Sequence, residues 1–427
     1  MISRSEDDFT RIALKAKAAQ DYFLLIGPPG TGKTSCALKK MVETFHTDKD
    51  AQILLLSYTN RAVDEICKSL ASIDPAVDFI RVGSELSCDE AYRGHLIENE
   101  LSSCNRRSEV YERIRNCRII VGTVAAISGK PELFRLKHFD VAIIDEATQI
   151  LEPQLLGILC ARGEDGKDAI DKFVLIGDHK QLPAVVQQNT EQSAIYDESL
   201  LSIGLANLKD SLFERLYRNC TATVHRSYDM LCRQGRMHPE VALFANRAFY
   251  GGRLIPVGLP HQIESSDTIC RLAFYPSVPE KAGASAKINY SEARIVADLA
   301  ARIYEDHQTD FDESRTLGII TPYRSQIALI KKEIESLGIP ALNRILVDTV
   351  ERFQGSERDV IIYSFCVNYP YQLKFLSNLT EEEGVLIDRK LNVALTRARK
   401  QMFITGVPEL LERNPLYKSL LKLIESF

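Results

Sequence analysis

Short apolar runs alternate along the chain with longer stretches in which apolar residues recur at helical spacing. Runs of four or five such residues are typical of strands buried on both faces of a parallel sheet, and the longer stretches are typical of the helices that cover it. The pattern therefore predicts an α/β fold with parallel sheets. Strands are expected at residues 22–26, 53–57, 118–122, 141–144 and 173–177 of the first half, and at 316–320, 346–349, 360–364 and 401–405 of the second.

The length of the chain predicts more than one domain. Its 427 residues exceed what a single hydrophobic core usually organises. We place one domain at residues 1–222 and the other at 223–427, with the boundary after a helix-like stretch that begins at Ser211. Residues 71–115 are polar and interrupt the strand rhythm, so they are expected to form a mostly helical insertion in the first domain.

Composition indicates the class of protein but does not identify its binding partners. A hydrophobic content of 45% and a charged content of 26% suit a soluble globular protein, and no apolar run is long enough to span a bilayer. No secretory pattern is visible, so a cytoplasmic location without membrane contact is expected. The nearest cysteines, Cys220 and Cys232, are too far apart for a CxxC metal site. A net charge of −5 does not exclude nucleic acid, because a motor needs only a local basic groove.

The stretch that follows the first predicted strand fits the phosphate-loop pattern GxxxxGK[ST]. It consists of Gly27, Pro28, Pro29, Gly30, Thr31, Gly32, Lys33 and Thr34. Glycines let backbone N–H groups turn toward phosphate oxygens, and a helix expected at 35–42 adds the positive end of its dipole. Lys33 is expected to reach the β- and γ-phosphates and Thr34 to ligate Mg²⁺. The loop therefore predicts binding of ATP with Mg²⁺.

Two adjacent carboxylates follow another predicted strand. Asp145 and Glu146 come directly after the apolar run 141–144. At a strand end, Asp145 is suited to hold Mg²⁺ and Glu146 to polarise the attacking water. A solvated acidic turn is the alternative for any isolated pair of acidic residues, but the position downstream of a phosphate loop favours the catalytic interpretation.

Nine motifs occur in the order found in the superfamily 1 helicases, and the chain resembles the branch that holds the nonsense-mediated-decay helicase and the Okazaki-fragment nuclease-helicase. They are GPPGTGKT at 27–34, SYTNRAVDEI at 57–66, VGTVAAI at 121–127, DEATQ at 145–149, GDHKQLPAVV at 177–186, RQGRMHPEV at 233–241, TPYRSQ at 321–326, TVERFQGSERD at 349–359 and LNVALTRAR at 391–399. The resemblance implies two RecA-like phosphate-loop domains with ATP in the cleft between them.

The resemblance also implies roles for matching residues in the nucleotide site. Gln181 corresponds to the residue that senses the γ-phosphate and couples it to the track. Arg236 and Arg397 correspond to two arginine fingers, which stabilise charge that develops on the transferred phosphoryl group. Glu357 corresponds to a residue that contacts the ribose.

The implied track is a single strand of nucleic acid, with DNA expected in preference to RNA although no motif distinguishes them. The family positions that contact it correspond here to Ser57, Thr59, Asn60, Thr123, Thr321, Tyr323 and Thr349. Hydroxyl and amide donors suit sequence-independent contacts with phosphates, and Tyr323 could stack on a base. The alternative is that the small polar residues cap helices and turns and that the tyrosine is half-buried in the core.

The sequence departs from the family pattern at the positions that read the base. The upstream glutamine that usually contacts adenine should fall near Phe9 or Thr10, and the aromatic residue expected before the first arginine finger is Gly235. These departures predict weak discrimination between ATP and GTP.

No room remains for the small β-barrel that often accompanies the first domain, and the Glu-x-Lys signature of a Mg²⁺ nuclease is absent from the sequence. A nuclease or accessory module on another chain or region is therefore expected as a partner. The function predicted is an ATP-driven 5′→3′ helicase or translocase. The alternative is an ATP-dependent switch that remodels a protein partner without nucleic acid.

Overall fold

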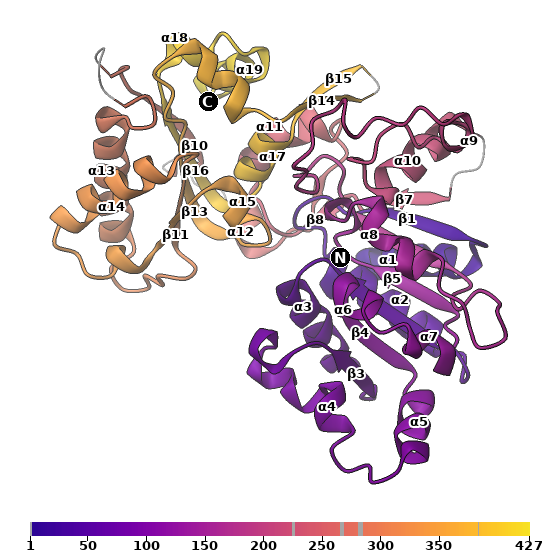
Figure 1. Ribbon diagram of the computed structural model, residues 1–427. Coiled ribbons are helices and arrows are strands. Elements are labelled where there is room, and N and C mark those ends of the chain that lie inside the picture. Colours follow the sequence, from indigo (N-terminus) through magenta and orange to yellow (C-terminus); the bar gives the residue numbers. More distant parts are fainter. Residues whose placement is uncertain (1, 224–226, 265–268, 281–284, 383) are drawn as a thin grey trace. The chain divides into compact units, whose positions relative to one another are not determined.

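The computed structural model describes residues 2–223, 227–264, 269–280, 285–382 and 384–427 (Figure 1). Contacts divide the chain into two compact units. Unit 1 comprises Met1–His179 and Pro183–Leu231, and unit 2 comprises Lys180–Leu182 and Cys232–Phe427. The division falls later than the predicted boundary between 222 and 223, because strand β7 (Tyr228–Met230) pairs with β1 (Tyr22–Ile26) and keeps this stretch in unit 1. Among the described helices, none combines the length and apolar character of a bilayer-spanning segment.

Unit 1 is built on a seven-stranded sheet in the order β3-β4-β2-β5-β6-β1-β7. Every pair of neighbours in it is parallel. Its other strands are β2 (Ile53–Ser57), β3 (Phe79–Val82), β4 (Ile119–Thr123), β5 (Val141–Ile144) and β6 (Phe173–Gly177). The five strands predicted here are confirmed to within one residue at each end.

The helices of unit 1 are α1 (Ile2–Ala18), α2 (Lys39–His46), α3 (Asn60–Ala71), α4 (Ile97–Glu100), α5 (Arg107–Asn116), α6 (Val124–Ser128), α7 (Glu132–Leu136), α8 (Glu152–Leu159), α9 (Glu198–Ser202) and α10 (Leu212–Ala222). Apolar side chains of α1, α2 and α3, among them Ile12, Met41 and Val63, share one buried cluster with residues of β1, β2 and β5. These three helices therefore pack on one face of the sheet.

The prediction that residues 71–115 form a helical insertion is wrong in part. The stretch contains β3, which pairs with β4 and extends the sheet at its edge. Arg81 in the middle of β3 breaks the apolar run, which is why the strand is hard to recognise in the sequence. The side chain is fully buried, and its guanidinium lies 2.9 Å from a carboxylate oxygen of Asp64 on α3. The rest of the stretch does hold two short helices, α4 and α5.

Unit 2 is built on a five-stranded sheet in the order β10-β16-β13-β11-β12, again with all neighbours parallel (Figure 1). These strands are β10 (Leu272–Pro276), β11 (Leu317–Ile320), β12 (Leu346–Asp348), β13 (Arg358–Ser364) and β16 (Ala398–Gly406). Helices α13 (Tyr290–Asp306) and α14 (Arg324–Ser336) bury apolar side chains in the same cluster as β11, β12 and β13. The two sheets confirm the predicted α/β class with parallel strands.

Smaller elements complete unit 2. They are the helices α11 (Pro239–Phe249), α12 (Pro260–Ile263), α15 (Val350–Phe353), α16 (Leu373–Leu376), α17 (Arg389–Leu395), α18 (Pro408–Leu411) and α19 (Pro415–Glu425), the short parallel pair β8 (Arg233–Gln234) and β9 (Ile255–Pro256), and the antiparallel pair β14 (Leu379–Glu382) and β15 (Val385–Asp388). In the seven-stranded and the five-stranded sheet all carboxyl ends of the strands lie at one edge, which is where ligands bind in folds of this class.

Candidate functional site

The first candidate site lies at the carboxyl edge of the unit 1 sheet. Strands β5, β6 and β1 are neighbours there, and each is followed directly by a motif: the acidic pair after β5, Gly177-Asp178 after β6 and the phosphate loop after β1. The backbone N–H of Gly27 donates to the carbonyl of Gly177 at 2.9 Å, which joins two of these loops. The topology thus brings together three motifs that are far apart in the sequence.

The backbone of the phosphate loop requires glycine at defined positions. Gly30 and Gly32 have φ angles of 73° and 75°, a left-handed conformation that side chains with a Cβ rarely adopt. A Cβ on Gly27 would lie 2.8 Å from Cβ of Lys33, so the loop could not close over a larger residue. The helix predicted at 35–42 is present as a π-helical turn over Lys33–Leu38 that continues into α2.

Asp145 and Thr34 are in direct contact. The hydroxyl of Thr34 donates to Oδ2 of Asp145 at 2.5 Å, and Asp145 is only 1% exposed. Burial and the neighbouring Glu146 carboxylate raise the pKa of Asp145 to about 6, against the lowering effects of Lys33 and Thr34. A hydroxyl beside a carboxylate offers the hard oxygen donors that Mg²⁺ prefers, so these two residues fit the predicted metal site.

Glu146 lies against Lys33. Lys33 Nζ is 3.1 Å from Oε1 of Glu146, and Gln149 donates to the other carboxylate oxygen at 2.7 Å. Burial alone would lower the pKa of Lys33, but the carboxylates of Glu146, Asp145 and Asp178 outweigh it and raise the pKa. Glu146 itself has a left-handed φ of 54°. Gln149 stands in the DEATQ motif, but no role was predicted for it.

The second group of predicted residues meets in unit 2, around Arg397. This side chain is 2% exposed, and its Nη2 donates to the Oε1 of Gln181 at 3.2 Å. Two backbone carbonyls, those of Val393 and Ser356, accept from its other nitrogens at 3.0 and 3.4 Å. Gln181 reaches this position because the tripeptide Lys180–Leu182 belongs to unit 2, where Asn392 Nδ2 donates to the carbonyl of Lys180 at 2.7 Å.

Arg236 and Glu357 form an ion pair in the same unit. Nε of Arg236 lies 2.5 Å from Oε2 of Glu357, and Nε of Arg399 lies 3.6 Å from the other oxygen. Burial works against the charged carboxyl, but Arg236 and Arg399 outweigh it and lower the pKa of Glu357. Glu357 immediately precedes β13 and Arg397 immediately precedes β16, so both lie at the amino edge of the unit 2 sheet.

The predicted track residues follow the carboxyl ends of β2, β4, β11 and β12, but they differ in exposure. Ser57 and Thr321 are fully buried, and Ser57 donates to the carbonyl of Asp145 at 3.2 Å, so neither hydroxyl is open to a strand as the structure stands. Thr59 and Thr123 cap α3 and α6 by accepting from backbone N–H groups, which is the alternative weighed for them. Three further residues are partly exposed: Asn60, Tyr323 and Thr349.

The positions expected to read the base hold no such contact. Phe9 packs against the core of unit 1, and its Cζ is 3.7 Å from the place where a Cβ of Gly32 would lie. The ring therefore lies beside the phosphate loop, where it offers no polar atom to adenine. Gly235 has no side chain, so it offers no ring to the base.

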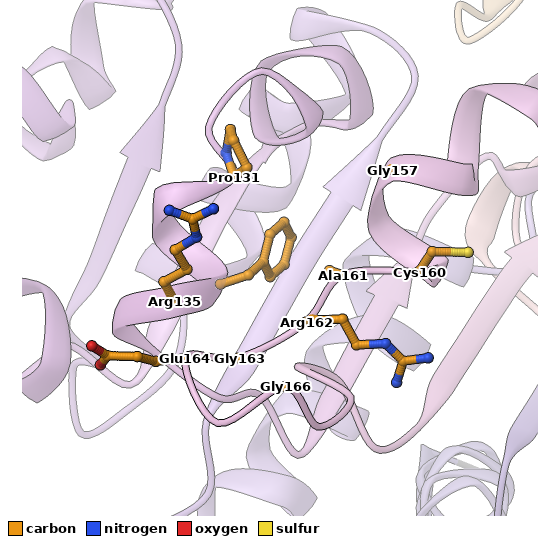
Figure 2. A pocket seen from close by; sticks show the side chains of 10 residues that line it. Pro131, Arg135, Gly157, Cys160, Ala161, Arg162, Gly163, Glu164 and Gly166 are labelled. Carbon is orange, nitrogen blue, oxygen red and sulfur yellow. The ribbon is translucent and has the colours of Figure 1, made fainter.

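A pocket of about 640 Å³ in unit 1 lies away from these motifs. Figure 2 shows that its lining comes from α7, the end of α8 and the loop that leads toward the amino end of β6, with Arg135, Cys160 and Glu164 among the side chains. None of the predicted site residues lines it, and the phosphate loop follows the carboxyl end of a neighbouring strand. The pocket is therefore separate from the nucleotide motifs.

Comparisons with known proteins show what the chain is similar to. Two family models, each described as an AAA domain, match the chain, one over residues 4–110 and 98–189 and the other over residues 208–409. DNA replication ATP-dependent helicase/nuclease DNA2 of Xenopus laevis is 30% identical over 437 residues, covering 92% of this chain and 36% of that protein. DNA polymerase alpha-associated DNA helicase A of Saccharomyces cerevisiae is 25% identical, covering 95% of this chain and 65% of that protein.

The chain thus spans about a third of the length of the first of these relatives. A solved complex of arterivirus nonstructural protein 10 (helicase) with DNA aligns over 96% of this chain and 65% of that chain, at 16% identity and a TM-score of 0.46.

Proposed function

Since this chain belongs to the superfamily 1 helicases, on the branch of the nonsense-mediated-decay helicase and the Okazaki-fragment nuclease-helicase, we propose that it hydrolyses ATP to move along single-stranded nucleic acid. One observation carries the proposal. The side chains of Lys33, Thr34, Asp145 and Glu146 are in direct contact where the phosphate loop meets the end of β5. Such a cluster has the cation, the metal ligands and the base that phosphoryl transfer to water requires.

Each residue of this cluster has a proposed task. The N–H groups of the phosphate loop and the Lys33 ammonium bind the β- and γ-phosphates. Thr34 and Asp145 would hold Mg²⁺, which neutralises charge on the phosphate oxygens when bound. Glu146 accepts a hydrogen bond from the attacking water and takes its proton, and Gln149 orients the carboxylate through the bond at 2.7 Å.

The arginines of unit 2 are proposed to act on the same γ-phosphate. Arg236 forms an ion pair with Glu357, and Arg397 donates hydrogen bonds to Gln181 and to a backbone carbonyl. A planar guanidinium donates two parallel hydrogen bonds to phosphate oxygens, so it stabilises the charge of the transferred group better than a point charge does. The direct bond between Gln181 and Arg397 supports a shared response of the two residues to the nucleotide.

DNA is the proposed track, because the relatives are named as DNA helicases. The nuclease activity in the name of the longer relative is not assigned to this chain, which spans about a third of that protein. A nuclease or accessory module on another chain or region stays a prediction, and so does a cytoplasmic location.

The ATPase rate is expected to rise severalfold or more when single-stranded DNA is added, because a translocase couples hydrolysis to its track. The measurement compares steady-state turnover with no nucleic acid, with a DNA oligonucleotide and with an RNA oligonucleotide of the same sequence and length. Stimulation by RNA alone would overturn DNA as the track. A rate that neither strand changes would instead support an ATP-dependent switch that remodels a protein partner.

Weak selection between ATP and GTP is the second expectation. Neither Phe9 nor Thr10 is the glutamine that reads adenine, and Gly235 offers no ring, so the triphosphate supplies most of the binding. Competition binding is expected to show ATP and GTP within about tenfold of each other, roughly the effect of a single hydrogen bond, since the glutamine that would read the edge of adenine is absent. The variant Gly235→Tyr is expected to strengthen ATP binding, because it supplies a ring on which the base can stack. A hundredfold preference of the unmodified protein for ATP would contradict the prediction.

A further inference from the structure

A short helical segment after β13 exposes aromatic side chains on its solvent face. The 3-10 turn Pro370–Gln372 continues into α16, and Leu373 and Leu376 face inward. On the outer face, Tyr371 is 54% exposed and Phe375 is 69% exposed. Residues four apart on a helix lie on the same side, so these two rings share one surface. Large apolar rings exposed on one surface make it a candidate for binding a partner.

Two aromatic rings of this segment stack on each other. Tyr369 and Tyr371 lie nearly parallel, with ring centroids 5.7 Å apart and an interplanar angle of 13°. Lys374 lies between Tyr371 and Phe375 in the sequence and is exposed as well. We call Tyr369, Tyr371, Lys374 and Phe375 the aromatic face. It combines flat π surfaces with a cation, which is the composition of surfaces that bind single strands of nucleic acid without regard to sequence.

Buried hydrogen bonds fix the aromatic face to its surroundings. Gln372 is 2% exposed, and its Oε1 accepts from the backbone N–H groups of Asn368 and Tyr369, both at 2.9 Å. Its Nε2 donates to the carbonyl of Ala286 at 2.8 Å and to the hydroxyl of Tyr323 at 3.2 Å. The segment is therefore held on both sides, and rings on a fixed backbone lose little freedom when a ligand binds.

The position of the aromatic face agrees with the proposed track. It follows the carboxyl end of β13, and Tyr323 and Thr349 follow the carboxyl ends of the neighbouring β11 and β12. Two more exposed cations stand nearby: Arg324 is adjacent to Tyr323, and Ser325 donates to the carbonyl of Lys287 at 2.9 Å. Together with Lys374, these side chains provide positive charge for a phosphate backbone that passes this edge.

We propose that bases of a single strand stack on Tyr371 and Phe375, so that the aromatic face is a base-binding site of unit 2. The inference rests on the proposed function, since it gives the proposed track a second set of contacts. Thr59, Asn60 and Thr349 offer polar atoms suited to phosphates, whereas the aromatic face offers π surfaces suited to bases. The three exposed cations favour a polyanion over an apolar peptide as the occupant.

The test compares a DNA homopolymer of thymidine with an abasic strand of the same length and charge. The unmodified protein is expected to bind the strand with bases more tightly. In the variants Tyr371→Ala and Phe375→Ala, affinity for the thymidine strand should fall by about fivefold or more for each ring, while affinity for the abasic strand stays the same. Tyr196→Ala serves as the matched control, because this tyrosine of unit 1 is 81% exposed.

A tryptophan variant would report directly on stacking at the aromatic face. The sequence contains no tryptophan, so Phe375→Trp gives a protein with a single indole at the aromatic face. Its fluorescence is expected to be quenched by the thymidine strand and left unchanged by the abasic strand. Equal losses on both strands in the alanine variants, or no quenching, would overturn the base-stacking site. If neither the unmodified protein nor any variant binds either strand, the proposed track is wrong instead. Quenching by a protein partner alone would assign the surface to that partner.

Discussion

Replacing Glu146 by glutamine is expected to lower ATP turnover by about a hundredfold or more while ATP still binds, because removal of a general base usually costs about 10²–10⁴ in rate. The structure separates the two effects. Glutamine keeps the shape of Glu146 and can still bond to Gln149, but it cannot take a proton from water. Lys33 keeps the carboxylate of Asp145 beside it, so the phosphate-binding cation stays in place. Steady-state turnover and the equilibrium affinity for ATP are the two measurements.

Lys33→Ala is the matched control, since it removes the other half of the same ion pair. This variant is expected to weaken nucleotide binding itself, because it removes the cation that faces the phosphates. The two variants should therefore differ in kind: one binds without turning over, and the other fails to bind. If Glu146→Gln turns over at nearly the normal rate, Glu146 is not the base.

The strands that the sequence predicts well are those whose residues are almost all apolar, with a polar residue only at an end. The runs that form β2 and β5 are buried over their whole length, so the signal depends on nothing outside the strand. Strand β3 was missed because Arg81, a charged residue, is buried in its middle and is compensated by Asp64 on α3. Strand β10 was missed as well, although its residues are apolar; it lies at the edge of its sheet, and only Leu272 in it is fully buried.

The nucleotide residues are predictable for a related reason. The phosphate loop and the acidic pair are each contiguous in the sequence, so their chemistry can be recognised without knowing the fold. The partners of the arginines are different. Glu357 lies far from Arg236 in the sequence, and Gln181 lies far from Arg397, and only the fold shows that each pair is in contact. The burial of the hydroxyls of Ser57 and Thr321 is likewise a property of the packing around them.

The contact between Arg236 and Glu357 leads to the last expectation. Arg236→Ala should lower turnover by about a thousandfold, the lower limit of the effect of an arginine finger, while ATP affinity changes little. The variant should fold, because the guanidinium is partly exposed and Arg399 remains to pair with the Glu357 carboxylate. Arg236→Lys should restore only a small part of the rate, since an ammonium cannot donate two parallel hydrogen bonds to a phosphate.

Arg399→Ala separates a finger from a structural ion pair. Arg399 also reaches Glu357 and pairs with Asp359 at 3.1 Å, so its removal takes the same charge from the same carboxylate. Turnover should stay within a few-fold of normal in this variant if Arg236 acts on the nucleotide. Equal losses in Arg236→Ala and Arg399→Ala would show instead that the rate depends on neutralising Glu357. The thermal midpoint of each variant, measured alongside, shows whether either loss comes from unfolding: a drop in turnover without a drop in the midpoint belongs to the chemistry.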